Sequence, residues 1–336
     1  MRKLINDPYA VVDDMLGGLL AAFPAQVELT ESGRGVIYTG ARARRRVGVI
    51  VGGGSGHEPA FFGYVGPGLA DAAAVGNVFA SPAATPAVEV ARRVAGEDGV
   101  LFLYGNYEGD IMNFDTATEL LADEGIAART VLVTDDVVSA PRETPEQRRG
   151  VAGDAIVFKA AGARAEEGGS GAEVALAARH ANDRTRSAGV GLGPCVVPTA
   201  GRPTFELPEG EMDIGMGVHG EVGIRRGELR PADEVADELL DVLLNDRPPR
   251  DGEPLHVLVN TLGATPLMEG LIVLRRVAAR LAQEGVRLHR AHVGEYVTSL
   301  EMAGLSLTLT HLDEELARLL DAPCRPLMAP AMGAWR

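Results

Sequence analysis

The chain has 336 residues, of which 46% are hydrophobic and 24% charged, a composition typical of a soluble globular protein with a large core. Its formal charge of −15 argues against a nucleic-acid or anionic-membrane partner, and aromatic residues, at 4%, are too few to form a stacking platform for bases or sugars. Two cysteines give neither a disulfide framework nor a zinc site. The basic N-terminal hexapeptide runs into Asp7 and Pro8 rather than an apolar stretch, so we expect a cytoplasmic protein without a signal peptide.

Strand-like and helical segments alternate in the first half of the chain. The predicted helices lie at 7–23, 85–94, about 114–123 and 173–186, and the predicted strands at 47–51, 100–104, 130–134 and 156–159. This alternation is typical of a mainly parallel, doubly wound α/β sheet.

The pattern changes after Ser187, where glycine-interrupted strands follow one another without a good helix between them. The predicted strands are 190–197, 213–219, 256–259, 288–293 and 306–310, and the predicted helices are 233–244, 267–284 and 313–320. Because single cores seldom grow beyond ~250 residues, we expect two α/β domains. The first spans 1–187, and the second, smaller and mixed, spans 188–336.

A glycine-rich segment with the sequence GGGSGHEP, from Gly52 to Pro59, follows the predicted strand 47–51. Glycines allow a sharp turn and close approach of the backbone to a ligand. Ligands of open α/β sheets bind beyond the carboxyl ends of the strands, where His57 would lie. A tight turn with a hydrogen-bonded histidine is the alternative interpretation.

The segment from Gly105 to Asp110 follows the next predicted strand, 100–104. In a parallel sheet, Asp110 would emerge at the same edge as His57, giving a carboxylate and an imidazole suited to acid–base chemistry. Asp110 could equally cap the N-terminus of the following helix.

A third candidate, His219, lies in the sequence MGVHGEVG, with glycines at 217, 220 and 223. Neutral imidazole is a competent nucleophile, and the small neighbours would leave this side chain accessible. A structural, hydrogen-bonded histidine is the commoner role for such a residue. The other histidines show no metal-ligand spacing, and no phosphate-binding loop, kinase signature or dinucleotide fingerprint is present.

Together these motifs resemble the substrate-binding K subunit of the dihydroxyacetone kinases across essentially the whole chain. The matching segments are 3–7, 52–59, 76–82, 106–107 with 109–110, 113–114, 116–120, 149–151, 217–221, 260 with 262–267, and 298–300. The resemblance implies two α/β domains, a homodimer, and a short ketose held as a hemiaminal on a histidine.

Carried across by position, the resemblance makes His219 the covalent ligand of the ketose carbonyl carbon. His57 would assist as an acid–base partner, and Asp110 would accept the proton of the hydroxyl that attacks the phosphoryl group. Backbone groups of residues 54–56 (Gly54, Ser55 and Gly56) would line the pocket.

The resemblance also implies that this chain binds no nucleotide itself. In the family, ADP or ATP with Mg²⁺ sits on a separate L domain or subunit, which free ATP or a phosphotransferase-system protein recharges. The expected partner of this chain is therefore a nucleotide-binding L subunit.

One departure from the family pattern concerns substrate choice. Gly105 stands where the family usually has lysine, and Glu108 where it often has threonine. Loss of the lysine would enlarge the pocket, and Glu108 would offer an acceptor for another hydroxyl. This favours a larger substrate such as the four-carbon ketose erythrulose, with neutral drift at the pocket rim as the alternative.

A competing hypothesis from another class is a non-catalytic ketose sensor that acts on a transcription factor. Asp110 favours the enzyme, because binding alone needs no base at the reacting hydroxyl. The replacement of lysine by Gly105 leaves the sensor hypothesis open.

Overall fold

The computed structural model describes residues 3–41 and 46–333, so the first two residues of the N-terminal hexapeptide and the last three residues of the chain lie outside it. Its α-helices are α1 (Val11–Ala22), α2 (Ala84–Val94), α3 (Glu108–Asp123), α4 (Asp154–Glu166), α5 (Gly171–Asp183), α6 (Ala232–Asp246), α7 (Leu267–Gln283) and α8 (Glu314–Asp321). Its strands are β1 (Val27–Leu29), β2 (Gly35–Tyr38), β3 (Gly48–Ser55), β4 (Ala72–Val78), β5 (Val100–Gly105), β6 (Ala128–Val133), β7 (Thr185–Gly193), β8 (Glu211–Ile214), β9 (Arg225–Glu228), β10 (Leu255–Thr261), β11 (Leu288–Gly294) and β12 (Ala303–His311).

The first sheet has the strand order β1-β2-β4-β3-β5-β6. Its four strands β4, β3, β5 and β6 are parallel, whereas β1 and β2 pair antiparallel at one edge. Buried on both faces, β3 and β5 read as continuous apolar runs, as expected for the centre of a parallel sheet. The carboxyl ends of these two strands meet at one edge, which carries the site described below.

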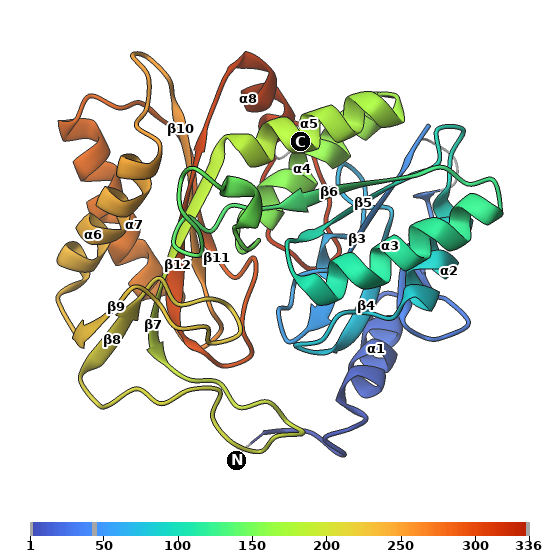
Figure 1. Cartoon of the computed structure of the whole chain (residues 1–336), viewed down its shortest axis with the longest axis horizontal. Helices are drawn as coiled ribbons and strands as arrows, with labels where there is room; N and C mark the ends of the chain where they lie inside the picture. Colours follow the sequence, from blue (N-terminus) through green and yellow to red (C-terminus); the bar gives the residue numbers. More distant parts are fainter. Residues whose placement is uncertain (1–2, 42–45, 334–336) are drawn as a thin grey trace.

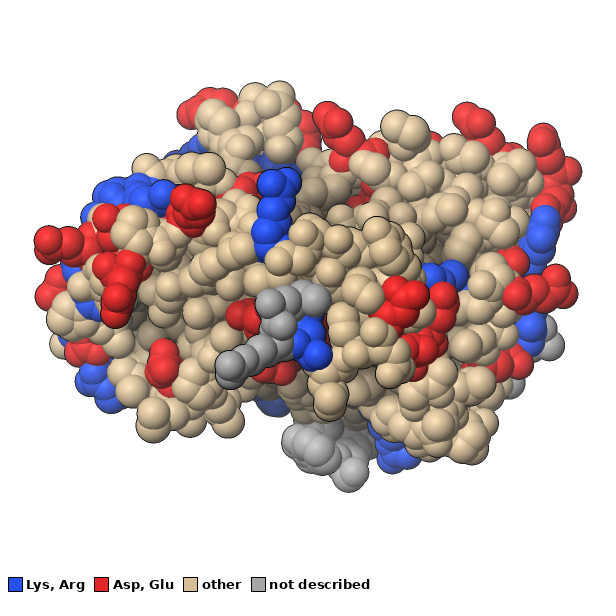
Figure 2. Space-filling view, turned by 90° about the horizontal axis from the view of Figure 1, so that it is seen from below, with Lys and Arg blue, Asp and Glu red and all other residues tan. Residues whose placement is uncertain are grey.

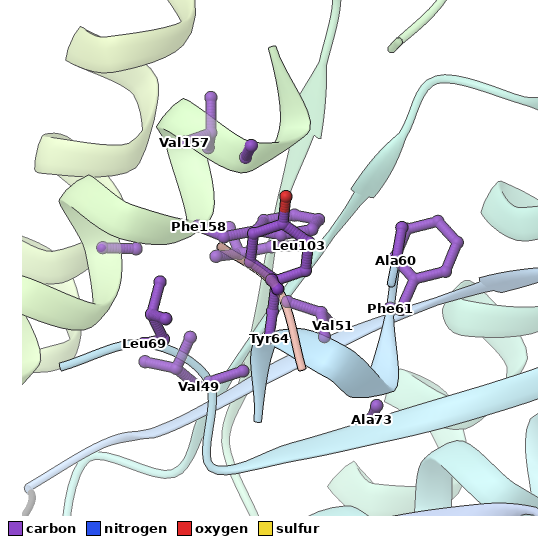
Figure 3. Packing of buried hydrophobic residues seen from close by; sticks show 14 of the residues in the cluster. Val49, Val51, Ala60, Phe61, Tyr64, Leu69, Ala73, Leu103, Val157 and Phe158 are labelled. Carbon is purple, nitrogen blue, oxygen red and sulfur yellow. The ribbon is translucent and has the colours of Figure 1, made fainter. Parts of the chain in front are cut away.

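Helices cover both faces of this sheet. Helices α2 and α3 pack on one face, and α4 and α5 pack on the other, so that α4 and α5 lie between the two sheets (Figure 1). Figure 3 shows Phe158 of α4 beside Tyr64, above Val49 and Val51 of β3. The ring centroids of Tyr64 and Phe158 are 5.6 Å apart in an edge-to-face arrangement. The doubly wound layout predicted for the first sheet is therefore confirmed.

The second sheet has the order β11-β10-β12-β7-β8-β9 and is mixed, because only β10 and β11 pair in parallel. Helices α6 and α7 cover its outer face (Figure 1). Strand β12 alternates leucines at 305, 307 and 309, which join that core, with buried hydroxyls at 306, 308 and 310. The hydroxyls pair across the sheet, for example Thr308 Oγ1 with Ser187 Oγ at 2.7 Å. The mixed α/β prediction for this half is confirmed, while a domain division at residue 187 stays a prediction.

One predicted strand was wrong. Residues 156–159 lie in α4, not in a strand. Nearly all residues of α4 are buried, because neighbouring helices and the first sheet surround it. A helix buried on all sides has no polar stripe, so its short apolar run could not be told from a buried strand by periodicity.

Other differences concern element ends. Helix α1 begins at Val11, not at residue 7, because the Asp7 carboxylate accepts the Tyr9 N–H and holds a turn there. Helix α5 ends at Asp183, and strand β7 starts two residues later. The strand expected at 213–219 ends with β8 at Ile214, since the next residue is glycine with φ of +85°. Among the described residues, no helix is long and apolar enough to cross a membrane.

A buried ion pair joins the segment after β6 to the end of α6. The guanidinium of Arg148, 1% exposed, donates to both carboxylate oxygens of Asp246, and Arg186 Nε donates to Asp246 Oδ2 at 2.7 Å. Asp246 thus holds together one arginine that precedes α4 and another that lies in β7.

We expect Asp246→Ala to lower the free energy of unfolding by about 3–5 kcal/mol, because two arginines would lose their shared partner in a largely buried place. Asp233→Ala is the matched control, since its pair with Arg275 is exposed and such pairs contribute less than about 1 kcal/mol. Urea unfolding of both variants measures the difference. Equal losses would show that the Asp246 ion pair is no stronger than a surface pair.

Candidate active site

His57 stands just beyond the carboxyl end of β3, as the sequence predicted. The glycines before it are needed for packing as well as for turning. A Cβ on Gly53 would lie 2.1 Å from the ring of Phe61, and one on Gly54 would lie 2.7 Å from the backbone nitrogen of Ala80. Gly56 has a φ of +96°, which glycine adopts without strain. The strand therefore continues through these glycines to Ser55.

Asp110 lies in the first turn of α3, which begins immediately after β5 and its loop. The N-cap of this helix is Tyr107, and no side chain caps it, so the N-capping interpretation of Asp110 was wrong. The Asp110 Oδ1 atom is buried and has no hydrogen-bond partner among the described residues. Burial raises the pKa of Asp110 to about 6, against the opposing effects of the Ser81 side chain and of His219. A carboxylate with this pKa is a suitable proton acceptor near neutral pH.

His219 lies in the loop that follows β8, and it comes to the edge of the first sheet from the other half of the chain. Its Nε2 atom is 3.0 Å from His57 Nε2, although the residues are 162 positions apart. The ring of Phe79 stacks on His57 with centroids 4.9 Å apart, and Tyr107 meets His219 edge-on at 5.0 Å. The sequence predicted that His57 and Asp110 share one sheet edge, and both line the same cavity here, together with His219, which the family resemblance had added to the site.

Two oxygen acceptors fix the outer nitrogens of this histidine pair. His57 Nδ1 is 2.8 Å from the carbonyl oxygen of Thr298, and His219 Nδ1 is 3.2 Å from Glu221 Oε1. The second Glu221 oxygen accepts the His219 backbone N–H at 2.9 Å. Both Nδ1 atoms therefore carry hydrogen, since a carbonyl and an ionised carboxylate can only accept.

The surroundings of the two histidines favour different charges on the two rings. Burial and the neighbouring charge of His219 lower the pKa of His57 to about 3, although the Thr298 carbonyl and Glu221 oppose this. Burial alone would raise the pKa of Glu221, but its hydrogen bond to His219, the charge of His219 and that of Arg149 lower it to about 2. Glu221 is thus an anion beside His219, and His57 strongly prefers to be neutral.

A small cavity of about 30 Å³ lies between these groups. Its described lining is Gly53, Gly54, His57, Phe61, Gly105, Tyr107, Asp110, Gly150, Asp154, Val218, His219 and Val297. Five residues predicted from the sequence are in this set: His57, His219, Asp110, Gly54 and Gly105.

The other three predicted site residues lie outside that lining. Ser55 is buried and its hydroxyl donates to the carbonyl oxygen of Gly76 at 2.7 Å, so it supports the adjoining backbone. The Gly56 N–H donates to the carboxylate of Glu58. Glu108 is exposed at the start of α3, which places its carboxylate at the surface.

Sequence reasoning gave no role to several groups that the structure brings to the site. Glu221 stands two residues after His219 in the same glycine-rich motif, and this short spacing was a usable signal. Arg149, which pairs with Asp136 and approaches Glu221 at 3.6 Å, lies in a segment that carried the family resemblance. The Thr298 carbonyl had no signal, because a backbone oxygen leaves no mark in the sequence.

On the face of the molecule seen from below, acidic side chains are interspersed with basic ones (Figure 2).

The site does not have the composition of a metal centre. Within 3–41 and 46–333, no group of three or more histidine, cysteine, aspartate or glutamate side chains is placed to hold a metal ion. The cavity instead brings together two imidazoles and a separate carboxyl group, which are side chains suited to nucleophilic and acid–base chemistry.

Known proteins with the same sequence pattern include enzymes of two substrate specificities. The chain is 48% identical to the dihydroxyacetone-binding subunit of PTS-dependent dihydroxyacetone kinase 2 of Listeria innocua, over 96% of this chain and 98% of the relative. It is 46% identical to D-erythrulose kinase of Mycolicibacterium smegmatis, over 96% of this chain but only 55% of that longer protein.

Solved structures with the same fold include both a kinase and a regulator. The dihydroxyacetone kinase of C. freundii, in complex with AMP-PNP and Mg²⁺, aligns with a TM-score of 0.89 and 32% identity over 98% of this chain and 61% of the kinase. The dihydroxyacetone kinase operon co-activator Dha-DhaQ aligns with a TM-score of 0.88 and 31% identity over 95% and 98% of the two chains. Residues 17–328 match the Dak1 domain. This chain therefore belongs to the Dak1 domain family.

Proposed function

We propose that this chain is the ketose-binding subunit of a dihydroxyacetone-type kinase. It holds a short ketose as a hemiaminal on His219 and presents a terminal hydroxyl to Asp110 for phosphorylation. The observation that carries the proposal is the contact of the two Nε2 atoms at 3.0 Å, in the same cavity as an Asp110 oxygen without a partner.

The positions of the protons in the histidine pair support a covalent role for His219. With hydrogen on both Nδ1 atoms, two neutral rings would bring two lone pairs together at the Nε2 contact. One further proton between the Nε2 atoms turns that contact into a hydrogen bond. This proton belongs on the His219 side, because burial makes a positive charge on His57 unfavourable and Glu221 lies beside His219.

Hemiaminal formation then needs no proton from outside the pair. The shared proton moves to His57 Nε2, which leaves a lone pair on His219 Nε2. That lone pair forms a bond to the ketone carbon as the C=O π bond breaks, and His57 Nε2–H gives its proton to the resulting alkoxide. The product is a hemiaminal hydroxyl on an alkylated, positively charged His219 ring, which the Glu221 carboxylate neutralises. Polyols such as glycerol have no electrophilic carbon and would not be trapped.

Asp110 is the group suited to the second step. Its carboxylate accepts the proton of the terminal hydroxyl as that oxygen attacks the phosphoryl group. The covalent bond to His219 orients the substrate for this attack, which is an entropic contribution to catalysis.

The phosphoryl donor would be supplied by a partner. The related kinases for which the match covers 55% and 61% of the length have further sequence outside the shared part. We infer that ADP or ATP with Mg²⁺ is held by a nucleotide-binding L subunit, with recharging by ATP or a phosphotransferase-system protein. We also infer that this chain works as a homodimer in the cytoplasm.

The pH dependence follows from Asp110. Since burial raises the pKa of this carboxyl to about 6, the proton-accepting form predominates only above that pH. We expect kcat for phosphorylation to fall tenfold per pH unit below about 6 and to level off above it. Initial rates between pH 5 and 8, with saturating partner, measure the profile. A flat profile through pH 6 would contradict a role for Asp110 as base.

The co-activator is the second candidate function, because its fold matches this chain as closely as that of the kinase. The two functions differ in whether Asp110 serves a reaction. Phosphorylation of a ketose by the wild-type chain, when an L subunit, nucleotide and Mg²⁺ are supplied, would exclude a purely sensing role.

The test of the proposal itself is native mass spectrometry of the whole chain with dihydroxyacetone and, separately, with erythrulose. We expect an adduct of one ketose per chain, and none with glycerol. Absence of an adduct with both ketoses, beside a dihydroxyacetone-binding subunit that forms one, would overturn the proposal.

A further inference from the structure

A second carboxyl group faces the cavity and has no part in the chemistry described above. Asp154 is the first residue of α4, is 3% exposed and lines the cavity together with Asp110, Gly105 and Gly150. Its Oδ1 atom is buried and has no hydrogen-bond partner within 3–41 and 46–333. A buried polar atom left without a partner costs about 1–3 kcal/mol, so its presence here calls for an explanation.

The neighbouring carboxyl group, Asp135, has an ordinary structural role and provides a contrast. Its two oxygens accept the backbone N–H groups of Val151 at 2.8 Å and Gly153 at 2.7 Å, just before α4 begins. Asp135 is not part of the cavity lining. The turn into α4 is thus held by Asp135, and Asp154 is left available to the cavity.

The protonation state of Asp154 suits recognition of a hydroxyl group. Burial raises its pKa well above the usual range, and the charges of Asp135 and Asp110 raise it further. This shift favours the protonated carboxyl, which can donate one hydrogen bond and accept others. Asp110, with a pKa of about 6, is the more readily ionised of the two cavity carboxyls.

The remaining described walls near Asp154 offer little else to a polar ligand. Phe61, Val218 and Val297 are apolar, and the Tyr107 hydroxyl already donates to the Gly150 carbonyl oxygen at 3.0 Å. Gly105 contributes no polar side chain to this wall. An unpaired carboxyl is therefore the group on this side that can hydrogen-bond an additional hydroxyl of the substrate.

We propose that Asp154 is a specificity-determining residue that hydrogen-bonds a hydroxyl of a ketose longer than dihydroxyacetone, so that a four-carbon ketose is bound in preference to the three-carbon one. The inference rests on the proposed function, since the ketose must be anchored at His219 for its other end to reach Asp154. It replaces the exposed Glu108 with a cavity residue as the partner of the additional hydroxyl.

The test compares adduct formation in wild type, Asp154→Ala and Asp154→Asn by native mass spectrometry at graded concentrations of dihydroxyacetone, D-erythrulose and L-erythrulose. For the erythrulose enantiomer that wild type binds better, we expect Asp154→Ala to raise the half-saturating concentration about 10- to 100-fold. The value for dihydroxyacetone should stay within about threefold. Asp154→Asn keeps a neutral donor and acceptor of the same shape, and should retain the preference.

Glu108→Ala is the matched control, because it removes a carboxylate from the first residue of the other helix at the site. We expect it to change neither half-saturating concentration. If Asp154→Ala does not fold, Asp154→Val, which keeps more of the cavity wall filled, takes its place. Asp154→Asn also has a separate readout. It should raise the melting temperature at pH 7, because burial raises the pKa of Asp154 in the folded chain and the unfolded variant would no longer gain from ionising this group.

The outcomes separate this inference from the proposed function. If wild type forms no adduct with any ketose, the proposed function fails, and the inference fails with it. If wild type forms adducts but Asp154→Ala weakens the three ketoses equally, or leaves the preference unchanged, Asp154 is a structural residue and only the inference is overturned. A wild-type preference for dihydroxyacetone would overturn it as well.

Discussion

Replacing His219 by alanine is expected to abolish the ketose adduct and to lower the phosphorylation rate by about 10²-fold or more. The ketone carbon would lose its bond to the chain, and misplacement of a reacting group by about 1 Å already costs on that order. Native mass spectrometry measures the adduct, and initial rates with the partner subunit measure the phosphorylation.

His180→Ala provides the control for loss of a histidine. His180 lies on α5 and contacts Asp313 at 2.6 Å, outside the cavity lining, so its removal should leave the adduct intact. An adduct that persisted in His219→Ala would show that another group traps the ketose.

Asp110→Asn should separate binding from reaction. The adduct should form as in wild type, because the histidine pair and Glu221 are unchanged. Phosphorylation should fall about 10²–10⁴-fold, the usual contribution of a positioned base. The same two assays measure the separation, and the rise in rate through pH 6 should disappear in the variant.

Asp115→Asn, an exposed aspartate of the same helix, is the control for this change. It should alter neither assay. If Asp110→Asn abolished the adduct as well, the carboxylate would be serving substrate binding rather than the transfer step.

Much of the fold could be predicted because hydrophobic period and turn residues act locally. Strands β3, β5 and β6 are short apolar runs, and α6 and α7 have one apolar face, so their pattern indicates their type. Strands β1, β2 and β4 of the same sheet were not predicted. Helix α4 could not be assigned in this way, since burial on all sides removes the polar stripe that distinguishes a helix. Where residues distant in the sequence surround a helix, its own sequence shows no periodic alternation of apolar and polar residues.

The candidate site was predictable where chemistry and glycine stand together in the sequence. His57, Asp110 and His219 each follow a strand end or lie among glycines, and the structure brings all three to one cavity. Asp154 gave no such signal, because an aspartate at the start of a helix usually serves the helix itself. Its free oxygen and its place in the cavity are properties of the fold alone.

The hydrogen bond between His57 and the Thr298 carbonyl has a consequence for synthesis of the chain. The two residues are 241 positions apart, so at 5–20 residues per second the ribosome delivers the second roughly 10–50 s after the first. Until then nothing fixes the proton on His57 Nδ1, and the pair with His219 cannot assume its charge distribution. Reactivity toward ketones should therefore appear only in chains that extend past residue 298, and a nascent chain stalled before it should not form the adduct.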